Sequence, residues 1–161
     1  MPYLIELNLL PQVWSLKAKL INIKMRYNKI SDLIIDPQSK EKISFDGKNF
    51  VSKNNEFIID EEILNMFQYD EKTDDITKKQ KKFYEDVMFP NYDDLDDFSS
   101  LINKSEKSMF VRKLDNELPY SSNIIEIGCG TGQLSNFLSR YNRTIIGTDI
   151  SLNSLKLAND F

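Results

Sequence analysis

The sequence predicts an α/β fold in which a smaller β unit precedes the start of a parallel sheet. Residues 123–128 form a short apolar run that ends in glycine, and residues 144–149 form a second apolar run that ends in an acid. Residues 133–141, between them, have the apolar spacing of a helix with one buried face. A strand, a helix and a second strand in this order form a βαβ unit, whose two strands are parallel. We expect the first of these strands to be buried inside the sheet.

The helices of this region carry their own sequence signals. Leu134, Phe137 and Leu138 are spaced to share one face of the first helix. Ser151 can cap a second helix over residues 152–160, because its side-chain oxygen can accept a hydrogen bond from a free backbone N–H.

Composition limits the possible functions. The chain has 161 residues, enough for one ordinary domain or two small ones, and a net charge of −4 with both signs mixed, which gives no strong nucleic-acid signal. No apolar run approaches the roughly 18 residues of a membrane span. A single cysteine excludes an internal disulfide and makes a cytoplasmic protein the default expectation. The absence of histidine excludes Ser-His-Asp and Cys-His catalytic sites and any His-ligated metal.

Differences in composition and hydrophobic pattern along the chain predict four segments. Residues 1–28 form an N-terminal extension whose periodicity is ambiguous and is interrupted by Pro11. Residues 29–69 form the small β unit, and residues 70–118 form a charged linker and helices. Residues 119–161 hold the βαβ unit.

Two of these segments predict particular elements. In the β unit, the dipeptide Asp46-Gly47 is a hairpin signal, because both residues tolerate the positive φ of a tight turn. The strands around it are expected at residues 42–45, 48–51 and 56–59, with a short closing segment at 63–67. In the linker segment, one amphipathic helix is expected over residues 101–118, with an apolar face made by Leu101, Met109, Phe110, Val111 and Leu114.

The loop after the first parallel strand carries the chemistry. Residues 126–132 read EIGCGTG, and glycines at alternate positions let the backbone turn sharply and approach a ligand closely. The loop leads into the N-terminus of a helix, so its free backbone N–H groups can face that ligand. Asp149 ends the adjacent strand, where a carboxylate can accept hydrogen bonds from ribose hydroxyls. Thr131 is expected to supply a hydroxyl at the start of the helix.

Two other nucleotide-binding loops fit this sequence less well. A dinucleotide loop, G-x-G-x-x-G, would need glycine at the position of Gln133. A Walker loop, G-x-x-x-x-G-K-[ST], is absent. A unit that binds NAD is therefore kept as the weaker alternative.

Residues 124–161 resemble the class I S-adenosylmethionine-dependent methyltransferases, which have a Rossmann-like fold. Their first motif reads E/D-x-G-x-G-x-G, and their second is an acid at the end of the next strand. The resemblance implies S-adenosyl-L-methionine as cofactor and a cofactor-binding set of seven residues: Glu126, Gly128, Cys129, Gly130, Gly132, Asp149 and Ile150.

The resemblance also implies a role for each position. The three glycines would run beneath the methionine part of the cofactor, and Glu126 would help to place its amino group through water. Asp149 would hold the ribose hydroxyls, and Ile150 would pack beside the adenine. Cys129 fills a variable position whose backbone would touch the cofactor, and its thiol is expected to be unreactive.

Two upstream stretches are similar to segments found in such proteins. Residues 83–92, FYEDVMFPNY, resemble an "FYE…PFPNY" lead-in of bacterial methyltransferases, with Met88 in place of the first proline. In those proteins the stretch can lie over the cofactor cleft, so we keep two interpretations of it here, a lid over the site and a simple linker.

Residues 36–39 and 52–55 have the spacing of C-P-x-C and C-x-x-C in the zinc-ribbon-like domains of methyltransferase activators. None of these positions is cysteine, so no bound zinc is expected, and an unrelated hairpin is the alternative.

By resemblance, a complete methyltransferase sheet has about seven strands, and the C-terminal region supplies two, with open edges. We therefore expect a C-terminally incomplete methyltransferase that is inactive alone, with no assigned catalytic residue and an unknown methyl acceptor. The alternative from another class is a non-catalytic module that keeps the cofactor loop and works through a partner chain, or through a missing C-terminal part, that completes the sheet.

Overall fold

The computed structural model describes residues 3–7, 16–67, 75–93, 95 and 97–161, with side chains from residue 23 onward. Pro11 and its predicted effect lie outside the described residues. The elements in chain order are β1 (Tyr3–Leu7), α1 (Leu16–Ile30), a 3₁₀ turn η1 (Ser31–Leu33), β2 (Ser44–Phe45), β3 (Phe50–Val51), β4 (Glu56–Phe57), β5 (Ile59–Asp60), β6 (Ile63–Asn65), α2 (Asp75–Asp86), α3 (Phe98–Glu106), α4 (Met109–Glu117), β7 (Asn123–Ile127), α5 (Gln133–Leu138), β8 (Thr144–Asp149) and α6 (Leu152–Asp160).

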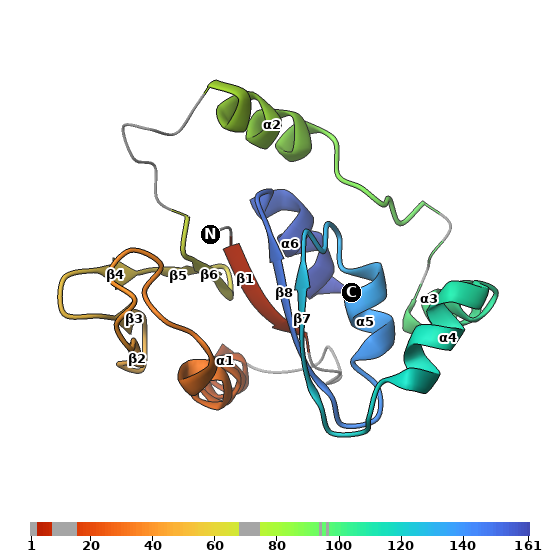
Figure 1. Cartoon of the computed structure of the whole chain (residues 1–161), viewed down its shortest axis with the longest axis horizontal. Helices are drawn as coiled ribbons and strands as arrows, with labels where there is room; N and C mark the ends of the chain where they lie inside the picture. The colour runs from red at the N-terminus through yellow and green to blue at the C-terminus, as the bar shows by residue number, and fades with distance from the viewer. Residues whose placement is uncertain (1–2, 8–15, 68–74, 94, 96) are drawn as a thin grey trace.

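A five-stranded sheet in the order β5-β6-β1-β8-β7 forms the centre of the molecule (Figure 1). Strands β7 and β8 are parallel, with Ile125 opposite Ile146, and every other pair in this sheet is antiparallel. A second, three-stranded antiparallel sheet has the order β2-β3-β4. The mixed α/β class and the parallel βαβ pair predicted from the sequence are confirmed.

Strand β1 fills an edge that was expected to be open. It runs antiparallel to β8 along residues 145–149, with Leu4 opposite Thr148, and pairs on its other side with β6. The expectation of an open edge is therefore wrong for β8. A strand more than a hundred residues away closes that edge, and local periodicity does not reveal such a pairing. The predicted segment boundaries at residues 28, 69 and 118 stay predictions, but strands from three of the four segments share this sheet.

Strand β7 differs from the buried strand that was expected. Its outer edge has no strand partner among the described residues. Ile125 and Ile127 are 59% and 81% exposed, while Ile124 packs in the core on the opposite face. Alternate residues of a strand point to opposite faces, so β7 is covered on one face only.

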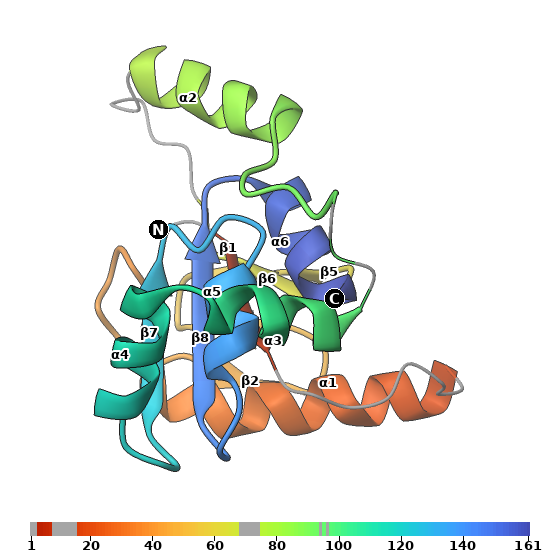
Figure 2. The ribbon, with the colours of Figure 1, turned by 90° about the vertical axis from the view of Figure 1, so that its right-hand side faces the viewer.

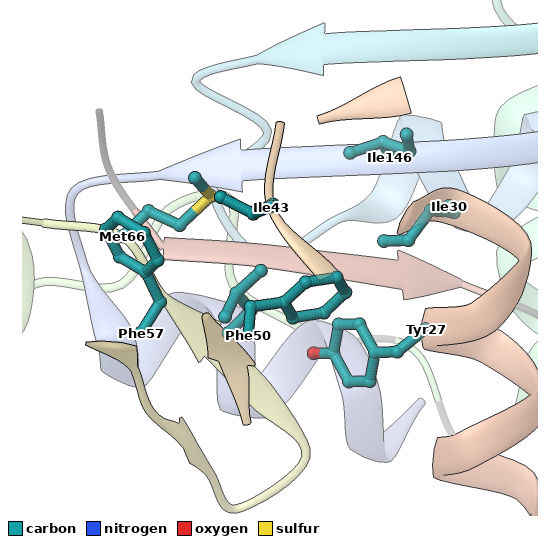
Figure 3. Close-up of a cluster of buried hydrophobic side chains, with 8 residues drawn as sticks. Tyr27, Ile30, Ile43, Phe50, Phe57, Met66 and Ile146 are labelled. Carbon is teal, nitrogen blue, oxygen red and sulfur yellow. The ribbon is translucent and has the colours of Figure 1, made fainter. Parts of the chain in front are cut away.

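The two faces of the sheet have different cores. Ile145 points to the face where Leu101, Phe137 and Leu138 form a cluster, which confirms the predicted apolar face of α5. The neighbouring Ile146 points to the other face. There α1 and the small β unit supply the cluster shown in Figure 3, which contains Tyr27, Ile30, Ile43, Phe50, Phe57, Leu64, Met66 and Ile146.

The helix expected over residues 101–118 is two helices. Asp97 and Ser100 form a capping box at the start of α3, and α3 ends at Glu106. The Ser108 side chain then accepts a hydrogen bond from Val111 N and begins α4. The second N-cap redirects the chain, so Met109 and Phe110 are 76% and 69% exposed and the prediction that they face the core is wrong.

Helix α5 is also shorter than expected. It ends at Leu138 instead of continuing to residue 141, because Tyr141 and Asn142 have φ values of 60° and 58°, outside the right-handed helical region. Helix α6 begins as predicted, since the Ser151 side chain accepts a hydrogen bond from Ser154 N at 3.1 Å.

The charged stretch before α3 contains α2, which has no buried residue and lies away from the sheet in Figure 2. The β unit contains the predicted hairpin: Gly47 has a φ of +102°, and the Asp46 carboxylate accepts hydrogen bonds from Lys48 N and Asn49 N. None of the described helices is both long and apolar enough to cross a membrane.

The two stretches with zinc-ribbon spacing meet at a carboxylate. Asp36 is fully buried and accepts hydrogen bonds from Ser52 Oγ at 2.7 Å and Asn55 Nδ2 at 2.8 Å. The backbone N–H groups of Gln38 and Ser39 also donate to it. In the part of the chain that the structure describes, no three His, Cys, Asp or Glu side chains form a metal-binding group. The absence of bound zinc stays a prediction.

Candidate cofactor-binding site

The glycine loop lies between β7 and α5 and needs glycine for its shape. Gly128, Gly130 and Gly132 have φ values of 74°, 53° and 74°, a left-handed backbone that costs other residues energy. Gly132 is the N-cap of α5 and makes no side-chain cap. The loop is fixed to β8 because Gly128 N and Cys129 N both donate to Thr148 O.

Asp149 joins the loop to the end of β8. Its Oδ2 accepts a hydrogen bond from Gly130 N at 2.8 Å, and its Oδ1 accepts one from Ser151 N at 2.9 Å. An ionised carboxylate offers about four acceptor positions. Two of these positions accept the bonds from the loop and from the following turn, so acceptor positions remain for hydrogen bonds from a ligand.

A cavity of about 510 Å³ opens above the loop and the end of β8. A cavity of this volume suits a small organic ligand. Its walls contain four members of the predicted set, Gly128, Gly130, Asp149 and Ile150. The other lining residues are Phe67, Tyr84, Phe89, Ile127 and Ser154.

The remaining three predicted residues do not line the cavity. The carboxylate of Glu126 is half-buried and accepts a hydrogen bond from the Ser135 hydroxyl. Burial raises the pKa of Glu126 above its ordinary value, against the effect of this hydrogen bond, and the nearby Asp149 charge adds to the rise. Gly132 is the N-cap of α5 and does not line the cavity.

Cys129 faces the interior and not the cavity. It is 5% exposed and packs with Leu155 and Ala158 of α6. Burial raises the pKa of the Cys129 thiol, and the carboxylates of Glu126 and Asp149 raise it further. The thiol therefore stays protonated, as expected for an unreactive position.

Residues 84–92, which we call the strap, comprise the last three residues of α2 and the segment that follows it, and Tyr84 and Phe89 of the strap form a second wall of the cavity. Thr131 N donates to Phe89 O at 3.3 Å, and the Thr131 hydroxyl donates to Pro90 O. The Tyr92 hydroxyl donates a hydrogen bond to Thr131 O at 2.7 Å. Burial raises the pKa of Tyr92 to about 12, so this hydroxyl keeps its proton. Thr131 thus binds the strap, and the expectation that its hydroxyl serves the helix start is wrong.

The strap also explains one of the glycines. A Cβ on Gly130 would lie 2.1 Å from Phe89 O, far inside van der Waals contact, whereas a Cβ on Gly128 would meet nothing within 4 Å. Gly130 lets the strap backbone approach the loop. Gly128 leaves open space beside the cavity.

Sequence reasoning missed several residues of this site. Phe67, Ile127 and Ser154 line the cavity without a motif that marks them. Ser135 was also missed: it is the third residue of α5, and its hydroxyl donates a hydrogen bond to the Glu126 carboxylate of the first motif.

A model of a methyltransferase domain matches residues 125–161, which include the glycine loop, Asp149 and α6. No curated protein and no solved structure matches the chain. The matched segment is therefore similar to part of a methyltransferase domain, and it carries the four cavity-lining residues predicted from the motif.

Proposed function

We propose that this chain is part of an S-adenosylmethionine-dependent methyltransferase and that the cavity binds this cofactor. One observation carries the proposal. The glycine loop and Asp149, the two features that define the motif, lie in the matched segment and line one cavity of suitable size. The dinucleotide alternative lacks the third glycine that its loop requires.

The residues of the cavity fit an adenosyl ligand. Asp149 has acceptor capacity for two ribose hydroxyls after its bonds to Gly130 N and Ser151 N. Gly128 leaves room for close approach, since no atom lies within 4 Å of a Cβ built there. Ile150 provides an apolar contact for a purine ring. Glu126, at the end of β7 just before the loop, would help to orient the amino group of the methionine part.

S-adenosylmethionine supplies a methyl group on a sulfonium, which transfers to a nucleophile by in-line displacement. Positioning makes the largest contribution that a protein gives to such a step. The chain has no histidine to act as a general base, and we assign no catalytic residue or acceptor.

Calorimetric titration tests the proposal. Purified chain should bind S-adenosylhomocysteine and not NAD. Asp149→Asn should weaken that binding roughly tenfold, because it loses charge-assisted hydrogen bonds to the ligand. Asp32→Asn, an exposed aspartate in η1, is the matched control and should leave the affinity unchanged. Binding of NAD alone would overturn the proposal.

A second candidate is a non-catalytic module that acts through a partner. The observation that favours it is the outer edge of β7, which has no strand partner among the described residues and exposes Ile125. The unpaired backbone groups of an edge strand invite pairing with another chain, and the one charged side chain of β7, Glu126, is hydrogen-bonded to Ser135 of α5. With a second copy of this chain as the partner, the purified chain self-associates, and Ile125→Lys makes it monomeric. A monomeric wild-type chain that binds S-adenosylhomocysteine contradicts it, and sedimentation velocity distinguishes the two.

A further inference from the structure

The strap is attached to α6 through Glu85, a residue outside the motif. Glu85 Oε1 accepts a hydrogen bond from Leu152 N at 2.9 Å, and its Oε2 accepts one from Asn153 N at 3.1 Å. These N–H groups belong to the first turn of the helix, where no partner within the helix exists. A carboxylate is favoured there by the helix dipole. One side chain thus caps α6 from a position 67 residues away.

Two backbone carbonyls of the strap strengthen this attachment. Ser151 Oγ donates to Tyr84 O at 2.9 Å, and Asn153 Nδ2 donates to Glu85 O at 3.0 Å. Ser151 is fully buried, and its hydroxyl also accepts the capping bond from Ser154 N. The attachment is therefore a network of four hydrogen bonds between the strap and the start of α6.

The same turn carries the acid of the cofactor site. Ser151 N donates to Asp149 Oδ1, so the strap and Asp149 hold opposite sides of one turn. The other end of the strap is fixed to the glycine loop through Phe89 O and Pro90 O. The strap therefore connects the two ligand-facing parts of the cavity.

The aromatic residues of the strap complete the geometry. Tyr84 and Phe89 line the cavity beside Ile150 and Asp149, and they are 44% and 73% exposed. Exposed aromatic rings on a cavity wall offer an apolar surface that a purine ring can cover. Their positions depend on how the strap is held.

We propose that Glu85 is a positioning residue that clamps the strap across the cavity, so that Tyr84 and Phe89 close over an adenosyl ligand. The ligand part of this inference rests on the proposed function. Glu85 acts through the strap and the turn at Ser151 and does not touch the ligand. With the clamp intact, the strap slows ligand release.

Glu85→Gln tests the clamp, because glutamine keeps the shape but has only one acceptor oxygen for two N–H donors. In the ligand-free chain, amide hydrogen exchange of residues 84–92 should accelerate roughly tenfold, while the amides of β8 keep their wild-type rates. Affinity for S-adenosylhomocysteine should fall about tenfold, through a faster dissociation rate. Glu117→Gln, at an exposed position of α4, is the matched control and should change neither measurement.

Asn153→Ala is the second variant. It removes one bond of the network and should produce the same changes to a smaller extent. If Glu85→Gln also accelerates exchange in β8, the loss is global and Asn153→Ala decides the question.

Wild-type exchange of the strap in both variants would overturn the clamp. Faster exchange with unchanged affinity would overturn its role in holding ligand. A wild-type chain that does not bind S-adenosylhomocysteine would overturn the proposed function and the ligand part of this inference, whereas the exchange measurement decides the clamp without any ligand.

Discussion

Asp36 joins two loops of the small β unit with one buried carboxylate. Burial by itself raises the pKa of Asp36, but hydrogen bonds from Asn55, Ser52 and two backbone N–H groups outweigh it and hold the pKa well below its ordinary value. The two stretches with zinc-ribbon spacing, residues 36–39 and 52–55, are thus connected by hydrogen bonds to the ionised Asp36 carboxylate. This contribution to stability is present above the ordinary aspartate pKa of about 3.9 and is lost as the pH falls below it.

Asp36→Asn should lower the free energy of unfolding by about 2 kcal/mol at neutral pH, because charge-assisted hydrogen bonds are lost. Urea unfolding measures the change. Asp32→Asn, exposed four residues earlier, is the control and should have little effect. The variant should also lose less stability than the wild type as the pH falls below about 4, because the Asp36 carboxylate of the unfolded chain then gains a proton while that of the folded chain, with its lowered pKa, stays ionised. Equal acid sensitivity in both proteins would contradict the role given to Asp36.

Gly128 and Gly130 provide a matched pair of residues with the same backbone requirement. Alanine at either position costs about 1–2 kcal/mol for the left-handed backbone. Only Gly130→Ala also collides with Phe89 O, so it should displace the strap and increase chymotrypsin cleavage within residues 84–92. Gly128→Ala should leave cleavage near the wild-type rate and weaken ligand binding instead. Equal cleavage in the two variants would show that the strap does not depend on Gly130.

The residues of the candidate site could be predicted only where a local pattern marks them. The spacing of EIGCGTG and the acid at the end of β8 identify Gly128, Gly130 and Asp149. The FYEDVMFPNY stretch marks the segment that contains Glu85, but the role of this residue could not be predicted. Its partners are 67 and 68 residues away, and they are backbone N–H groups, which every residue except proline has.

At the scale of elements, Arg143 anchors α4 to the start of β8. Its guanidinium is buried, pairs with the Asp115 carboxylate and donates to the backbone carbonyls of Asp115 and Leu118 at 2.9 and 2.8 Å. Arg140 pairs with the same carboxylate at 2.7 Å. A buried cation without its partner is strongly unfavourable, so this pair connects the two elements.

Asp115→Asn should therefore lower the free energy of unfolding by about 3 kcal/mol. Glu106→Gln is the comparison, because Glu106 pairs with Arg140 at 3.6 Å with a side chain that is 53% exposed, and such a pair contributes less than about 1 kcal/mol. Urea denaturation of both variants measures the difference. Similar losses in the two would show that the buried pair does not anchor α4.

The elements that could be predicted are those with strong local signals. Strand β8 matches its predicted bounds because an apolar run ends in aspartate, and α6 begins where Ser151 caps it. The break between α3 and α4 was missed because the apolar spacing continues across it, while the N-cap at Ser108 decides the chain direction.

At the scale of the whole molecule, one sheet links the small β unit to the methyltransferase-like βαβ unit. Strand β1 is the connection, since it pairs with β6 on one side and β8 on the other. The opposite edge, β7, has no strand partner in the described part of the chain. This arrangement depends on long-range pairing and could not be predicted from periodicity, which reports only the face of each element.

The glycine loop and the end of β8 form the proposed site for an adenosyl ligand. The most direct test is a titration of ¹⁵N-labelled chain with S-adenosylhomocysteine, followed through the amide resonances of its five glycines. Gly128, Gly130 and Gly132 should shift with a common affinity, while Gly47, in the hairpin of the β unit, stays in place as an internal control. Loop resonances that do not move at saturating ligand, or a shift confined to Gly47, would contradict the claim.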